Sequence, residues 1–161
     1  MFAKRRVKAP AKTIAAELFQ QFVQEPSVVM PDGAPAECED RAALDDELRL
    51  YRFASVLLAV LDAEHRDAAF SAVRDELERL FFPACAAEGR AQLVFVRKAM
   101  SQLAELIQPE GEPRPMSWAL RWFQRVGAHE TNPALLDLFA LQWLDHFLAV
   151  AGALREFKPV T

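Results

Sequence analysis

Two tryptophans and two arginines around position 120 are the residues best suited to recognition chemistry in this chain. Trp118, Arg121, Trp122 and Arg125 fall on one arc of about 100° if the segment 117–126 is helical. Trp and Arg dominate the energetic centres of interfaces, because they combine large contact area with a directional polar group. We therefore predict that this arc binds a protein partner or a second copy of the chain. The alternative is that both indoles complete the edge of the core, with the Arg stems covering them.

A weaker pattern joins one carboxylate and one imidazole. Asp62 and His65 are three residues apart, so they can share a helix face. With a third ligand they would form a mononuclear metal site, whereas a di-iron bundle needs two Glu-x-x-His motifs and two further glutamates. Asp62 is equally suited to capping the next helix. An enzyme or metal protein built on this pair is therefore the third of three functional hypotheses.

Familiar catalytic and cofactor motifs are missing from the sequence. It has no Gly-rich phosphate loop, nucleophile elbow, C-x-x-C pair or zincin motif. Three histidines, two cysteines and one tyrosine are a small supply for acid–base or nucleophilic chemistry. Cys38 and Cys85 are expected to be free thiols, since two scattered cysteines do not make a disulfide framework. These absences favour a non-enzymatic protein without a cofactor.

The N-terminal twelve residues are basic, whereas the chain as a whole carries a formal net charge of −4. The candidate anion-binding residues in this basic arm are Lys4, Arg5, Arg6 and Lys8. Such an arm can contact nucleic acid or another anionic surface. The acidic remainder of the chain would repel phosphate, so nucleic acid is the weaker interpretation. A solvated or self-docked tail is the stronger one.

The most apolar stretch of the sequence, residues 134–151, contains Asp137, Asp145 and His146. Charged groups at that density are costly in lipid, so we expect no membrane span. No uninterrupted apolar segment follows the N-terminal basic residues, so no signal peptide is expected. The default expectation is a cytoplasmic protein.

Glycine and proline divide the sequence into periodic apolar segments, which predicts an all-α, compact bundle of about six helices. Pro83 should end the third helix, and Asn132 followed by Pro133 should start the sixth. A single helical domain is expected over 13–158, after the arm 1–12 and with a long loop at 26–40. The helices near 40–61 and 133–157 should be central. The six predicted segments are 13–25, 40–61, 67–82, 90–108, 117–126 and 133–157.

Twelve Phe and three Trp give the chain enough aromatic surface either to fill a core or to line a pocket. A pocket for a small apolar ligand would involve Phe53, Phe95, Phe139 and Trp143. This is the alternative to the first hypothesis, a non-enzymatic interaction module that associates with itself.

Overall fold

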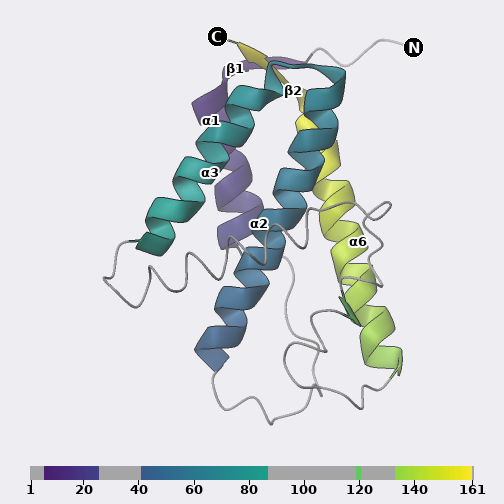
Figure 1. The fold of residues 1–161 in the computed structure, drawn as a ribbon. Helices are drawn as coiled ribbons and strands as arrows, with labels where there is room; N and C mark the ends of the chain where they lie inside the picture. The colour runs from purple at the N-terminus through teal and green to yellow at the C-terminus, as the bar shows by residue number, and fades with distance from the viewer. Residues whose placement is uncertain (1–5, 26–40, 87–118, 121–132, 161) are drawn as a thin grey trace, which may run out of the picture.

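The structure is a computed structural model that describes residues 6–25, 41–86, 119–120 and 133–160. Most of these residues are helical, as predicted, and a short pair of strands joins the two ends of the chain (Figure 1). In chain order the elements are β1 (Val7–Pro10), α1 (Ala11–Phe19), the π-helical turn η1 (Gln20–Gln24), α2 (Arg41–Arg66), α3 (Phe70–Ala86), α6 (Pro133–Glu156) and β2 (Phe157–Val160).

The two strands correct the all-α prediction. β1 and β2 pair in parallel, with Val7 opposite Phe157 and Pro10 opposite Val160. Each strand has only four residues and one proline, so neither shows the alternation by which a strand is recognised in a sequence. Residues 7–10 of the basic arm therefore belong to the sheet, and the buried side chain of Ala9 joins the core.

Two predicted helix ends are wrong. α2 continues past Leu61 to Arg66, and α3 continues past Pro83 to Ala86. A proline removes one backbone hydrogen bond, and within the last turn of a helix that loss is small enough to be tolerated. The predicted start of the last helix at Pro133 is confirmed. The segments 90–108 and 117–126 lie outside the described residues, except 119–120, which are helical, so the count of six helices stays a prediction.

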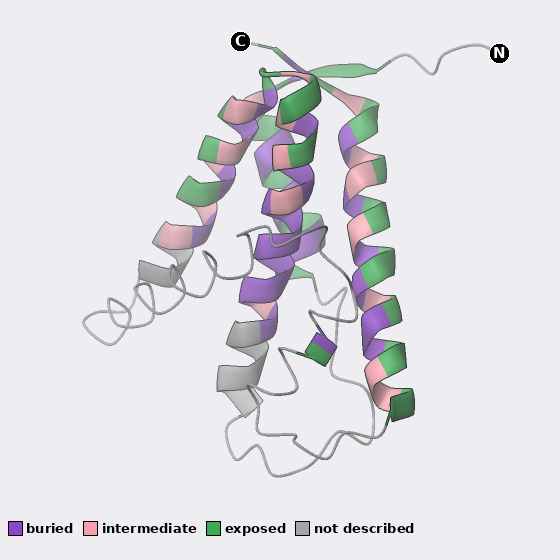
Figure 2. Cartoon of the chain, turned by 45° about the vertical axis from the view of Figure 1, so that its right-hand side comes forward, coloured by how far each residue is buried: buried purple, intermediate pink, exposed green. Residues whose placement is uncertain are grey.

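α2 is the central helix of the described structure. It packs against η1, α3 and α6, and its burial is nearly continuous from Leu48 to Val60 (Figure 2). Such a helix has to be apolar almost all round, which agrees with the sequence of this segment. The buried apolar residues of α2 are Leu48, Leu50, Tyr51, Phe53, Ala54, Val56, Leu57, Ala59, Val60 and Ala63.

One buried charge ties α2 to the end of η1. Arg52 is only 7% exposed, and its Nε donates a hydrogen bond of 3.1 Å to the backbone carbonyl of Val23. The last carbonyls of a helix accept no hydrogen bond from within that helix. A side-chain donor from a neighbouring element therefore stabilises the helix end. This bond links segments that are 29 residues apart in the sequence.

Replacing Arg52 with methionine is expected to lower the free energy of unfolding by about 2 kcal/mol, because hydrogen bonds to charged groups contribute roughly 1.5–3 kcal/mol. Urea denaturation monitored by circular dichroism measures this change. Arg79→Met is the matched control, since the Arg79 side chain is 73% exposed and pairs only at the surface with Glu76. The control should stay within about 0.5 kcal/mol of the wild type. Equal stability of the two variants would contradict the role given to Arg52.

Candidate interaction surface

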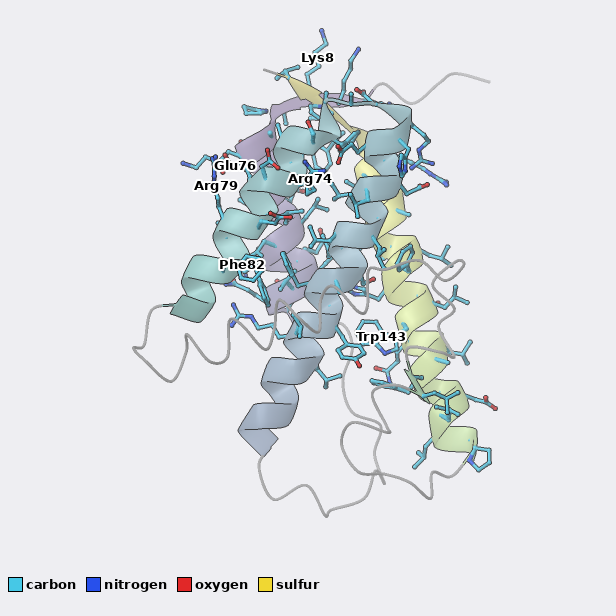
Figure 3. All side chains as sticks on the ribbon, viewed as in Figure 1. Lys8, Arg74, Glu76, Arg79, Phe82 and Trp143 are labelled. Carbon is cyan, nitrogen blue, oxygen red and sulfur yellow. The ribbon has the colours of Figure 1, made fainter. Side chains whose placement is uncertain are left out.

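The buried face of α6 packs against the rest of the helical core. Figure 3 shows Trp143 on the side of α6 that faces α2, and its indole lies 5.9 Å from the ring of Tyr51 in α2. The residues on this face recur at helical spacing, as expected for one side of an amphipathic helix. They are Phe139, Ala140, Trp143, His146, Val150 and Leu154.

His146 is the unexpected member of this buried face. Its imidazole is 3% exposed and meets the rings of Phe22 and Trp143 edge-on, with both centroid distances 5.8 Å. Burial lowers the pKa of His146 to about 4; a hydrogen bond with the Arg52 backbone opposes this shift, and the Arg52 charge adds to it. The imidazole is therefore neutral near pH 7 and acts as a core residue. This burial is not predicted from the sequence, in which His146 is only a polar residue of the stretch 134–151.

The opposite face of α6 carries four exposed leucines, together with the exposed Asp137 and Asp145. Leu138, Leu141, Leu144 and Leu148 are 54%, 55%, 40% and 61% exposed, respectively. At 100° per residue these four positions, which we call the leucine stripe, cover an arc of about 120°. Figure 2 shows the exposed side of α6 along its length. Several exposed leucines gathered on one side of a helix mark an interaction site more often than single scattered ones do.

The predicted central place of α6 stays a prediction, because residues 87–118 and 121–132 lie outside the described part of the chain. Only one side of α6 is covered by the described part of the chain, whereas α2 is buried on nearly all sides between Leu48 and Val60. By length and composition alone α6 could also cross a membrane, since an 18-residue window within it has a mean hydropathy of 1.4. Core helices of soluble proteins meet the same criterion. The window is 28% buried inside the protein, and its interior side carries the packed His146.

The residues predicted to bind a partner lie elsewhere. Trp118, Arg121, Trp122 and Arg125 are outside the described residues, so the predicted Trp–Arg arc stays a prediction. Of the two described positions beside it, Ala119 is fully buried and Leu120 is 42% exposed.

The candidate metal pair lies on the last turns of α2. Asp62 and His65 are both exposed, and Oδ2 of Asp62 is 2.8 Å from Nη2 of Arg66. Within the described ranges, no group of three or more His, Cys, Asp or Glu side chains is placed to hold a metal ion. The metal hypothesis therefore has no third ligand in this part of the chain.

The candidate anion-binding arm is only partly described. Lys4 and Arg5 lie outside the described residues, whereas Arg6 and Lys8 are exposed at the strand end of the molecule. The register of the sheet places Lys8 opposite Lys158, which is also exposed (Figure 3 labels Lys8). Like charges opposite one another are destabilising unless an anion or solvent screens them.

The aromatic residues proposed for an apolar pocket are packed in the described core. The ring of Phe53 stacks on Phe81 at 3.9 Å, and Phe139 meets Trp143 edge-on at 5.8 Å. Phe95, the fourth residue of the proposed lining, lies outside the described residues. The three described rings therefore contact aromatic neighbours directly, which is the geometry of a filled core.

Comparison of the chain with protein-family models, with curated proteins and with solved structures finds no match. The fold is a mainly helical one with a small parallel sheet, and its function has to be inferred from its own surface.

Proposed function

We propose that this protein is a non-enzymatic interaction module that associates with a second copy of itself through the leucine stripe of α6. The observation that carries the proposal is the exposure of four leucines on one side of a regular, 24-residue helix. Burying a fully exposed leucine contributes roughly 1.5–3 kcal/mol, so covering these half-exposed side chains favours association.

The spacing of the stripe favours a helix as the occupant. Leu141, Leu144 and Leu148 are separated by three and then four residues, which is the spacing of an apolar seam between two helices. The three leucines cover about 10 Å of helix axis, since the rise is 1.5 Å per residue. A standard interface needs roughly 800 Å² from each partner, so the contact must extend along α6 beyond the leucines.

Charges at the two ends of α6 favour a second copy in antiparallel orientation. Asp137 and Arg155 are both exposed, and Asp137 lies seven residues before Leu144 while Arg155 lies seven after Leu148. They therefore extend the same seam at its two ends. An antiparallel pair centred near His146 would place Leu144 against the partner's Leu148 and Asp137 against the partner's Arg155. The surface is thus complementary to itself, as a two-fold interface requires.

The first test is the double variant Leu141→Glu/Leu148→Glu. We expect the wild type to show a concentration-dependent dimer in sedimentation equilibrium, and we expect this variant to be monomeric. Two carboxylates in the seam should raise the dimer dissociation constant by at least about a hundredfold, since interface truncations alone often exceed 1 kcal/mol each. Ala72→Glu, on the exposed side of α3, is the matched control and should dimerise like the wild type.

A charge exchange separates self-association from other uses of the same surface. Asp137→Arg alone should weaken the dimer by repulsion with Arg155, and Asp137→Arg/Arg155→Asp should restore it. A wild type that stays monomeric at all concentrations overturns the proposal. Partition of that monomer into lipid vesicles, lost in the Leu141→Glu/Leu148→Glu variant, would instead assign the leucine stripe to a membrane surface.

A further inference from the structure

A hollow of about 280 Å³ lies at the end of the molecule where the two strands pair. There α2 and α6 end, α3 begins, and β1 passes beside them (Figure 1). Three arginines from distant parts of the sequence line the hollow. Arg6 precedes β1, Arg66 is the last residue of α2, and Arg155 is in the last turn of α6.

The cations of this hollow outnumber its carboxylates. Within the part of the chain that the structure describes, neither Arg6 nor Arg155 forms an ion pair, while Arg66 pairs with Asp62. Among the described lining residues Asp67 is the only acidic one, and its Oδ1 accepts a hydrogen bond of 3.1 Å from the backbone N–H of Ala69. The hollow is therefore electropositive.

Helix electrostatics explain only part of this arrangement. A cation in the last turn of a helix interacts favourably with the helix dipole, which accounts for Arg66 and Arg155. Arg6 is outside any helix, yet the strand pairing brings it to the same place. The exposed Lys8 and Lys158 add positive charge to the same end of the molecule, because they lie opposite each other in the sheet.

The remaining lining residues that the structure describes are apolar. Ala63, Phe70 and Leu154 are all buried, and together they form an apolar wall of the hollow. A ligand that fits both parts has an anionic group for the arginines and an apolar body for this wall. The guanidinium group matches phosphate oxygens in geometry, and several guanidiniums together suit a dianion better than a single carboxylate.

We propose that this hollow binds a small phosphate monoester, with the arginines holding the phosphate and the apolar wall contacting the organic group. The hollow is argued from residues other than the leucine stripe, and two of its three arginines, Arg6 and Arg66, lie outside the α6 seam. Arg155 belongs to both surfaces, and so it is left unchanged in the test.

The test compares three probes on the full chain by isothermal titration calorimetry: phenyl phosphate, inorganic phosphate and benzoate. Phenyl phosphate should bind more tightly than inorganic phosphate, because only its ring contacts the apolar wall, and more tightly than benzoate, which has one negative charge. Arg6→Ala and Arg66→Ala should each weaken phenyl phosphate about tenfold, the change that a loss of 1.4 kcal/mol produces.

Arg79→Ala is the matched control, because this exposed arginine on α3 pairs with Glu76 and does not line the hollow. It should bind phenyl phosphate like the wild type, and circular dichroism should show all three variants to be folded. The proposal is overturned if phenyl phosphate does not saturate the wild type or if Arg79→Ala weakens binding as much as Arg6→Ala. Benzoate binding as tight as that of phenyl phosphate would overturn the phosphate assignment. The Leu141→Glu/Leu148→Glu variant keeps all three arginines of the hollow, so phenyl phosphate should still saturate it even if the wild type proves not to dimerise.

Discussion

Phe53→Ala is expected to lower the free energy of unfolding by about 3–5 kcal/mol, the usual cost of truncating a buried phenylalanine. Phe53 is fully buried in the middle of α2, and its ring stacks on Phe81 with centroids 3.9 Å apart and an interplanar angle of 4°. Phe82 closes the cluster edge-on at 6.2 Å from Phe53. The truncation leaves a cavity between α2 and α3, and cavity formation adds to the lost apolar transfer energy.

Urea denaturation monitored by circular dichroism gives the size of the effect. Domains are typically stable by only 5–15 kcal/mol, so Phe53→Ala could unfold the chain outright. Phe53→Leu keeps most of the side-chain volume and should lower the free energy of unfolding clearly less than Phe53→Ala. The two variants then form a graded series that stays measurable. Phe82→Ala, at a half-buried position, is the control and should also cost less. A loss below about 1 kcal/mol for Phe53→Ala would mean that the two helices are not packed as described.

Acid is expected to destabilise the protein through His146 before most carboxylates titrate. The pKa of His146 is lowered from 6.5 to about 4, chiefly because burial disfavours the charged imidazolium. Between these two values the unfolded chain binds more protons than the native one, so stability rises with pH in this interval. The contribution is fully present above pH 6.5 and is lost as the pH falls toward 4. At 1.36 kcal/mol per pKa unit, the total change is about 3 kcal/mol.

Comparing a His146 variant with the wild type separates the pH dependence caused by His146 from that caused by the carboxylates. His146→Gln removes the titrating group, so its unfolding free energy should change less between about pH 6.5 and pH 5 than that of the wild type. His146→Gln should itself be less stable at neutral pH, because it disturbs the contacts with Phe22 and the Arg52 backbone. His65→Gln, at an exposed position on α2, should keep the wild-type pH profile. Parallel profiles for His146→Gln and wild type would show that the imidazole is not buried in the native state.

Much of the helical structure could be predicted because apolar spacing and helix breakers are local signals. The apolar run after Leu50 gave a buried α2, and the pair Asn132–Pro133 gave the start of α6. The strands could not be predicted, since four-residue segments have no period of their own and their pairing joins opposite ends of the chain. The helix end predicted at Pro83 was wrong, because the energetic cost of a proline depends on how many helical turns it interrupts.

The orientation of α6 shows the limit of arguments from polarity. In the sequence His146 counts with Asp137 and Asp145 as a polar residue of the apolar stretch 134–151, and nothing there predicts burial of the imidazole. The structure buries it, because the Arg52 backbone and two aromatic rings accommodate a neutral imidazole. The exposed leucine stripe had one usable signal, the seam spacing of Leu141, Leu144 and Leu148. For the arginine hollow the sequence indicated only Arg6, as part of the basic arm, since residues 6, 66 and 155 meet only after the chain has folded.

The parallel pairing of β1 and β2 also decides how the protein would respond to mechanical tension. A pull on the two chain ends acts on the start of β1 and on the end of β2, which lie at opposite ends of a parallel ladder. The load is then a shear along the strands, shared by all the ladder hydrogen bonds at once. In an antiparallel hairpin pulled from its open end the bonds would break one after another. We therefore expect the strand pair to carry a force applied to the two termini before that force reaches α2 and the core.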